Sequence, residues 1–326
     1  FDHQKNAKGL LIEEARTQYV THSIDLNSGL PSKGTGVTIR TASNIVDPSG
    51  GSETRKLVQS PASNGNIYQS AFNTIASHFT DGTTHTRSIY AKKAEMNWIR
   101  IQHYDGTDNL GAYFNLETGQ VGTVNSGVTA QISDAGNGWF RCSVTRVTPA
   151  GRNDAERLQV GLATGDNVSL VYTGDGVSGV YLAFGQLEIG AFPSSFIPSY
   201  GASTTVRAAD IVNVTGTNFS SFYKDSQGTT IVDAQVAKGF DDENSFPRLY
   251  SYNDSTTADM IRVYLGSSNK FVGSIRKNST SIGDKLAPLD LDDDDGGVFR
   301  FGQLYKTNRH VVFTNGVQGE VDTTVD

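Results

Sequence analysis

The feature that most constrains the fold is a long series of short segments in which apolar and polar residues alternate. From residue 86 onward they include "RSIYAK", "NWIRIQHYD" and "GVYLAFGQLEI", separated by turn clusters such as "DGTDN" and "DAGNG". Alternation with a period of two is typical of strands, and many short strands at this spacing indicate a β-sandwich or jelly roll. Helical periodicity is nearly absent, and its best stretch, residues 9–17, is too short to form a stable helix alone.

One segment without alternation of apolar and polar residues divides the chain into two parts. Residues 190–210 show no alternation and contain Pro193 and Pro198, which cannot donate to a strand ladder. A second series of strands follows and ends in a hairpin signal, Asn315-Gly316 between two alternating runs. The predicted parts are an N-terminal arm at 1–30, a first β-sandwich at 31–190, a linker at 191–208 and a second β-sandwich at 209–326. Because the chain opens at Phe1 without a Met, we expect both ends to be cut from a longer polypeptide.

Composition excludes several classes of protein. The chain has 326 residues, a net charge of -7 and no run of Lys or Arg, which argues against a nucleic-acid partner. No apolar stretch approaches the roughly 20 residues that span a bilayer, so we expect no membrane insertion. Cys142 is the only cysteine, which excludes an intramolecular disulfide and a zinc cluster built on cysteines.

The tetrapeptide Phe-Gly-Gln-Leu occurs twice, at 184–187 and at 301–304. The first copy ends a strand and leads into the proline-containing segment, whereas the second leads into a turn and a further hairpin. We therefore attribute the match to chance and to shared strand composition, and we predict no repeat from it.

Catalytic motifs are missing from the sequence. It contains no nucleophile elbow of a serine hydrolase, no H-E-x-x-H, no P-loop and no Rossmann glycine pattern. Glu320 and Asp322 begin the carboxylate pattern of sandwich-fold glycosidases, but no second Glu follows. We predict that the chain is not an enzyme.

The segment "DLDDDDGG" is the sharpest cluster of charge. Asp290, Asp292 and Asp294 alternate as in a calcium loop, but the sixth position is Asp295 and the twelfth is Gln303, so the segment is not an EF-hand. It is either a calcium site built on these four aspartates or a solvated acidic loop tip. We expect no other cofactor.

The strand "NWIRIQHY" suggests a binding surface. Alternation places Ile99, Ile101 and His103 on the core face, and the opposite face then carries Trp98, Arg100, Gln102 and Tyr104. Aromatic planes pack against the CH faces of sugar rings, and Arg and Gln bond to their hydroxyls, so this face is a candidate glycan site.

Other strands add to the candidate glycan site. Tyr113 and Asn115 lie opposite the core residues of "LGAYFNL", and in the second half Tyr250 and Tyr252 share a face with Arg248. An alternative stays open, in which these aromatic side chains support sheet faces or subunit contacts.

Four segments carry a resemblance to a known family. They are "GQLEIGAFPSSFIPSYGASTTVRAAD" at 185–210, "GLLIEEART" at 9–17, "GNGWFRCSVT" at 136–145 and "YKTNRHVVFTNG" at 305–316. In pieces, most of residues 9–326 resembles bacteriophage virion proteins with concanavalin-A-like lectin domains. The first of the four segments is the most specific.

The resemblance implies an all-β fold of two tandem concanavalin-A-like (jelly-roll) sandwiches with an extended N-terminal arm. It implies a virion structural protein, such as a tail fibre, a tail-associated adhesin or a head fibre. Its partners would be other virion proteins and further copies of itself, with a trimer favoured. Our leading hypothesis is a non-enzymatic virion protein that displays lectin-like domains for attachment to host-surface polysaccharide. The alternatives are a purely structural decoration or assembly protein, and a carbohydrate-binding segment of a larger secreted polysaccharide-degrading enzyme.

Overall fold

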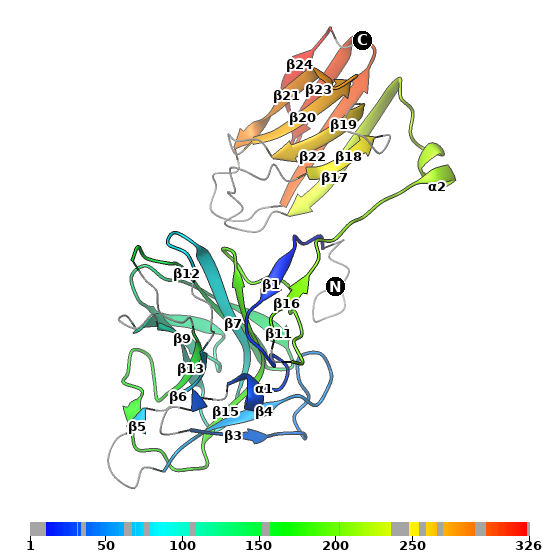
Figure 1. The fold of residues 1–326 in the computed structure, drawn as a ribbon. Helices are drawn as coiled ribbons and strands as arrows, with labels where there is room; N and C mark the ends of the chain where they lie inside the picture. Colours follow the sequence, from blue (N-terminus) through cyan, green and yellow to red (C-terminus); the bar gives the residue numbers. More distant parts are fainter. Residues whose placement is uncertain are drawn as a thin grey trace. The chain divides into compact units, whose positions relative to one another are not determined.

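The structure is a computed structural model, and it forms two compact units, Phe1–Ile211 and Val212–Asp326 (Figure 1). The residues that it describes are 11–30, 32–33, 37–61, 67–68, 70–74, 79–104, 109–151, 157–201, 203–235, 248–253, 259–265, 270–290 and 298–324. Within this part of the chain nearly every regular element is an antiparallel strand. The structure confirms the all-β fold class and the two tandem β-sandwiches.

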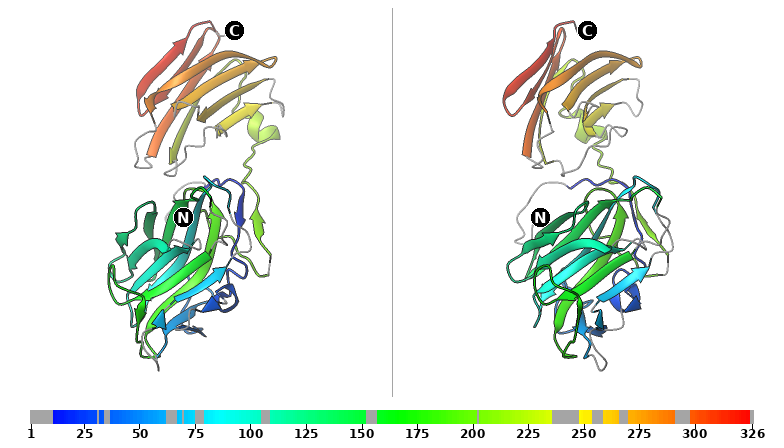
Figure 2. Two further views of the ribbon diagram at one scale, coloured as in Figure 1. Left: turned by 60° about the vertical axis from the view of Figure 1, so that its left-hand side comes forward. Right: turned by 90° about the vertical axis from the view of Figure 1, so that its left-hand side faces the viewer.

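Two antiparallel sheets of six described strands each build the first unit (Figure 2). One has the order β10 (Gln120–Val124), β9 (Asn109–Asn115), β8 (Trp98–Tyr104), β13 (Arg157–Ala163), β6 (Ser70–Thr74) and β2 (Ser32–Lys33). The other has the order β11 (Thr129–Gly136), β12 (Trp139–Val147), β7 (Thr84–Lys93), β15 (Gly179–Ile189), β4 (Arg55–Gln59) and β3 (Val37–Thr41). A short pair, β14 (Val171–Tyr172) with β5 (Ile67–Tyr68), lies beside them.

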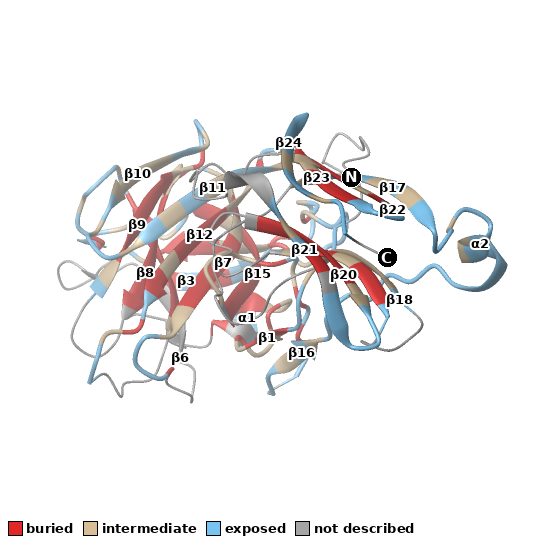
Figure 3. Cartoon of the chain, turned by 90° about the horizontal axis from the view of Figure 1, so that it is seen from above, coloured by how far each residue is buried: buried red, intermediate tan, exposed pale blue. Residues whose placement is uncertain are grey.

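The core of the first unit lies between these two sheets. Ile99 and Phe114 from one sheet and Ile89 and Leu187 from the other belong to one buried cluster, and none of the four side chains is exposed. Figure 3 shows the buried residues concentrated along the central strands. At about 25 cal/mol per Å² of apolar surface removed from water, burial of this kind is the main term that stabilises each sandwich.

The N-terminal residues differ from the predicted extended arm. Residues 16–18 form the strand β1 (Arg16–Gln18), and α1 (Leu26–Gly29) begins after the cap Asp25, whose carboxylate accepts from the Asn27 amide. Val20 and Leu26 are fully buried in the core of the first sandwich. Residues 16–30 are therefore part of the first sandwich, because Val20, Leu26 and Leu30 complete its core.

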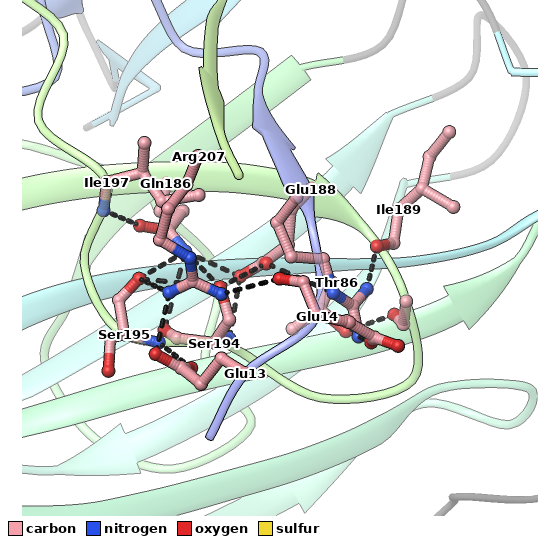
Figure 4. A network of polar contacts seen from close by, with 12 residues as sticks. Glu13, Glu14, Thr86, Gln186, Glu188, Ile189, Ser194, Ser195, Ile197 and Arg207 are labelled. Carbon is pink, nitrogen blue, oxygen red and sulfur yellow. Dashed lines mark hydrogen bonds and ion pairs between the residues drawn. The ribbon is translucent and has the colours of Figure 1, made fainter. Parts of the chain in front are cut away.

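The predicted linker at 191–208 also packs onto the first unit. Gln186 and Glu188 face away from the core, yet both side chains are fully buried. The Ser194 amide and hydroxyl donate to the Glu188 carboxylate at 2.9 and 2.6 Å, and the Ile197 amide donates to Gln186 Oε1 at 2.9 Å (Figure 4). Buried polar groups require such partners, and these bonds hold residues 194–197 against β15.

The N-terminal segment closes over this turn. β1 pairs with β16 (Thr205–Arg207), Arg207 Nη1 donates to Glu13 Oε2 at 2.7 Å, and the Glu13 amide donates to Asp210 Oδ2 at 2.9 Å. We call residues 13–18 and 186–210 together the terminal clasp. The unit boundary at 211/212 lies after the predicted linker because the clasp binds 191–208 to the first sandwich.

A β-bulge in β15 gives Gln186 and Glu188 their orientation. Phe184 has a φ of 53°, in the left-handed region, and the register of β15 on β7 shifts between Ala183 and Gln186. Because of the bulge, the successive residues Ala183 and Phe184 both belong to an apolar cluster on the outer side of the sheet. Alternation then resumes, and Leu187 lies in the core between the sheets. Stacking of Phe184 on Phe196, with ring centroids 4.6 Å apart, accompanies this strained conformation.

The second unit is a smaller sandwich. In its described residues one sheet has the order β17 (Gln227–Gln235), β22 (Val298–Lys306), β23 (Arg309–Thr314) and β24 (Val317–Asp322). The other has the order β18 (Arg248–Asn253), β19 (Met260–Leu265), β20 (Lys270–Lys277) and β21 (Thr280–Asp290). A short helix, α2 (Gly216–Ser220), precedes β17.

Side chains of both sheets meet in the core of the second unit. Val263 and Phe271 from one sheet contact Phe301 and Val312 from the other. The hairpin predicted from Asn315-Gly316 is confirmed, with φ of 50° and 82° at its two turn residues. Neither described helix has the length and apolar character that a membrane-spanning helix needs.

Candidate functional site

The strand β8 has the two faces predicted for it. Ile99 and Ile101 are fully buried in the core of the first sandwich. Trp98 lies on the opposite face, where it packs against Tyr113 and Leu170. The side chain of Tyr104 lies outside the described residues.

Loop residues cover the outer face of β8 and β9. The Tyr113 hydroxyl donates to the Val168 carbonyl at 2.6 Å, and only 6% of Tyr113 is exposed. A Cβ added at Gly122 would lie 2.7 Å from the Trp98 ring and 2.4 Å from Asp166 Oδ1, so the backbone passes close over the indole. Trp98 and Tyr113 therefore form a satellite apolar cluster beneath residues 163–170.

The polar side chains of this face bond within the protein. Arg100 donates to Asn125 Oδ1 at 2.9 Å and to the Asn109 carbonyl at 2.8 Å, and its guanidinium stacks 5.2 Å from the centre of the Tyr113 ring. Gln102 is fully buried and donates to Asn109 Oδ1 at 2.6 Å. Asn115 accepts from the amides of residues 117 and 118 and so stabilises the turn between β9 and β10. The geometry favours the supporting role that the sequence left open for this face.

The structure places Tyr250 and Tyr252, two of the predicted glycan-binding residues, on the inner face of β18. Tyr250 packs on the core of the second sandwich, and its hydroxyl donates to Gln303 Oε1 of the facing sheet at 2.5 Å. The Tyr252 hydroxyl lies 3.1 Å from Thr230 Oγ1, again across the sandwich. Both rings face inward because each hydroxyl finds a polar partner there, and burial raises the pKa of Tyr250 well above its ordinary value.

The acidic segment predicted to bind calcium lies largely outside the described residues. Asp292, Asp294 and Asp295 are not described, and of Asp290 only the backbone is described, as the last residue of β21. Among the described residues no group of three or more His, Cys, Asp or Glu side chains could hold a metal ion. Calcium binding by these aspartates stays a prediction.

A groove on the second sandwich is a site that the sequence did not reveal. It has a volume of about 360 Å³ and is lined by Gln227, Gly228, Thr229, Leu304, Tyr305, Lys306 and Arg309. Gln227 on β17 is paired with Lys306 on β22, which is paired with Arg309 on β23, so the three residues form one row across the sheet. Thr229 and Leu304 are paired in the next row on the same face. These five side chains alternate with the inward-facing residues and therefore lie on the outer face of the β17–β24 sheet.

The groove lies at the polar end of this face. The next outward-facing row on this sheet face, after Thr229 and Leu304, contains Ile231, Gly302 and Phe313. In the row after that, Arg300 forms a bidentate ion pair with Asp233 at 2.7 and 2.8 Å. Gly302 is buried, and a Cβ added there would lie in ordinary van der Waals contact with Phe313 at 3.7 Å. The groove combines two cations, an amide and a hydroxyl around one apolar side chain, Leu304.

A buried polar network lies on the inner side of the same strands. His310 is fully buried, and its Nε2 lies 2.7 Å from Gln303 Nε2. Burial lowers the pKa of His310 to about 4, so the ring is neutral at pH 7. Because it faces away from the groove, this network supports the sheet from within.

Comparison with known proteins identifies no family for this chain. No known protein family matches the sequence, and no curated protein matches it. Among solved structures, mouse laminin alpha1 chain domains LG4-5 are 10% identical over 81% of this chain and 77% of that chain, with a TM-score of 0.20. The LG1-3 region of the laminin alpha2 chain is 12% identical over 80% of this chain and 56% of that chain, also at 0.20. At these TM-scores the likeness supports no argument about this chain.

Proposed function

We propose that the chain is a non-enzymatic glycan-binding module of a phage virion protein, and that the groove on the second sandwich binds a host-surface glycan. The observation that carries this proposal is the set of outward-facing polar side chains around Leu304. Sugars are bound by hydroxyl partners beside an apolar patch, and Gln227, Thr229 and Arg309 provide such partners in a concave setting.

The lining residues support a role without catalysis. Glycoside hydrolysis uses a pair of carboxylates on either side of the scissile bond, and none of the residues that line the groove is Asp or Glu. Glu320, which begins the glycosidase-like pattern, accepts from the Leu286 amide of the facing sheet at 3.3 Å.

The assignment to a virion rests on the sequence motifs. In that setting the chain would assemble with other virion proteins and with copies of itself, a trimer being favoured by the resemblance. Several copies on one particle would bind a surface polysaccharide together, so weak individual sites would give strong attachment. The protein would then be found in the extracellular particle.

A glycan array probed with the full chain tests the proposal. We expect binding to a bacterial surface polysaccharide that Thr229→Trp reduces at least about tenfold, because the indole fills the groove, with the melting temperature unchanged. Gln318→Trp is the matched control, since Gln318 is also exposed, lies on the same sheet face and is not among the lining residues. Absence of any glycan signal, or equal binding by Thr229→Trp and the wild type, would overturn the proposal.

A purely structural role is the second candidate. It is favoured by the outer face of β8 and β9, whose predicted sugar-facing residues pack and bond within the protein. Under this candidate Trp98→Ala lowers the melting temperature of the first sandwich, and no glycan binds to either sandwich.

A further inference from the structure

Two cations lie directly opposite each other at the end of the groove. Lys306 ends β22 and Arg309 begins β23, and the two residues are register partners on either side of the turn at residues 307–308. Neighbouring strands lie about 4.8 Å apart, so both charges lie on one small area of the outer face. Like charges directly opposite each other in a sheet destabilise it.

Neither cation has an ion-pair partner in the described part of the chain. Both Lys306 and Arg309 are exposed. Arg300, on the same sheet face, has Asp233 as its partner. Asp225 precedes β17 and forms no ion pair with either cation; its charge contributes to the raised pKa of Tyr305, which is about 12 chiefly because of burial.

The protein as a whole does not favour anions. Its net charge is -7, so a general attraction for polyanions is not expected, and the positive potential at Lys306 and Arg309 is local. Two neighbouring cations that lack an ion-pair partner among the described residues suit a ligand that supplies negative charge.

We infer that the groove selects an acidic saccharide, with a carboxylate or sulfate of the sugar bound between Lys306 and Arg309. This inference rests on the proposed function and names the ligand class of the same site. The guanidinium can bind such a group through two parallel hydrogen bonds, while lysine adds a point charge. Gln227 and Thr229 then bond to sugar hydroxyls, and Leu304 packs against a CH face of the ring.

Calorimetric titration of the full chain with three related probes tests the inference. The probes are a tetra-uronate, the same tetramer with its carboxyls reduced to alcohols, and a sulfated form of that neutral tetramer. We expect the two anionic probes to bind at least about tenfold more tightly than the neutral one, with an affinity that falls as salt rises. The preferred anionic probe identifies carboxylate or sulfate as the natural group.

Charge-neutralising variants locate the effect. Arg309→Gln and Lys306→Gln should each weaken binding of the anionic probes by about tenfold and leave binding of the neutral probe unchanged. Arg300→Gln is the control, because it makes the same change in charge on the same sheet face at its far end. All three positions are exposed, so the melting temperature should show that the variants fold.

The outcomes separate this inference from the proposed function. Equal binding of neutral and acidic probes, or full binding of the acidic probes by Arg309→Gln and Lys306→Gln, would overturn the inference while glycan binding stands. Binding of none of the probes, together with an empty glycan array, would overturn both.

Discussion

At the scale of single residues, Glu188 explains why the predicted linker at 191–208 is bound to the first sandwich. Its carboxylate has no exposed surface and accepts from the Ser194 amide, the Ser194 hydroxyl and Gln186. Removing one partner of a buried charge network leaves the other groups without partners, which costs more than the bond itself contributes.

We therefore predict that Glu188→Ala lowers the free energy of unfolding of the first sandwich by about 3 kcal/mol. Chemical denaturation monitored by circular dichroism measures the change. Glu117→Ala is the control, since Glu117 forms an ion pair with Lys93 and both side chains are about half exposed, and it should cost less than about 1 kcal/mol. Equal losses for the two variants would show that the clasp contributes little.

We expect His310 to make the second sandwich sensitive to acid. Its pKa in the folded protein is about 4, below the ordinary value of 6.5 that it has when unfolded. The stability that depends on the neutral ring is fully present above pH 6.5 and is lost as the pH falls from 6.5 through 4. The size of the loss is at most about 3 kcal/mol, from 1.36 kcal/mol per pKa unit.

The prediction is a fall in the melting temperature of the second sandwich between pH 7 and pH 4. In His310→Gln this fall should be much smaller, because glutamine does not titrate. His85 in the first sandwich, whose pKa is lowered to about 2 mainly by burial, titrates in the same sense, so the comparison with the variant is needed to assign the effect. Identical pH profiles for the wild type and His310→Gln would refute the assignment.

At the scale of elements, β16 is the strand that joins the predicted linker to the N-terminus. A fragment that ends at residue 204 lacks β16 and leaves β1 without its partner, and it also loses Arg207, which donates to Glu13. A fragment that ends at residue 211 keeps the whole clasp.

We predict that the fragment 1–204 melts at least about 2 °C below the fragment 1–211, since 1 kcal/mol corresponds to about 2–4 °C in a domain of this size. Differential scanning calorimetry of the two fragments measures the difference. Equal melting temperatures would mean that β16 contributes no stability to the first sandwich.

Strands could be predicted from sequence because alternation and turn residues are local signals. The alternation of β8 and the Asn315-Gly316 hairpin are both present in the structure as predicted. Alternation divides a strand into two faces, however, and does not say which face is covered. The outer face of β8 is covered by residues 163–170, which show no periodicity, and Tyr250 faces inward because its hydroxyl has Gln303 as a partner.

The two copies of Phe-Gly-Gln-Leu illustrate the same limit. After the bulge at Phe184, Gln186 lies on the outer face of β15 and accepts from the Ile197 amide within the terminal clasp. In the second copy Gln303 lies between the sheets, beside His310. The groove could not be predicted from the sequence because its residues come from two distant segments, 227–229 and 304–309. The local signal that was present is Lys306 and Arg309 on either side of a two-residue turn, which indicates a cross-strand pair.

At the scale of the whole molecule, each unit has its own sheets and its own core. We predict two calorimetric transitions for the full chain, one for each sandwich, and limited proteolysis that separates them near residues 211–215, where the described backbone is exposed. A single cooperative transition, with neither fragment folded alone, would contradict two independent sandwiches.

The measurement that tests the central claim most directly is an amide NMR titration of the full chain with the tetra-uronate. If the groove is the binding site, the shifts that change are those of Gln227, Thr229 and residues 304–309, and the signals of β8 and β9 stay unchanged. Changes confined to β8 and β9, or no changes at millimolar probe, would contradict the account.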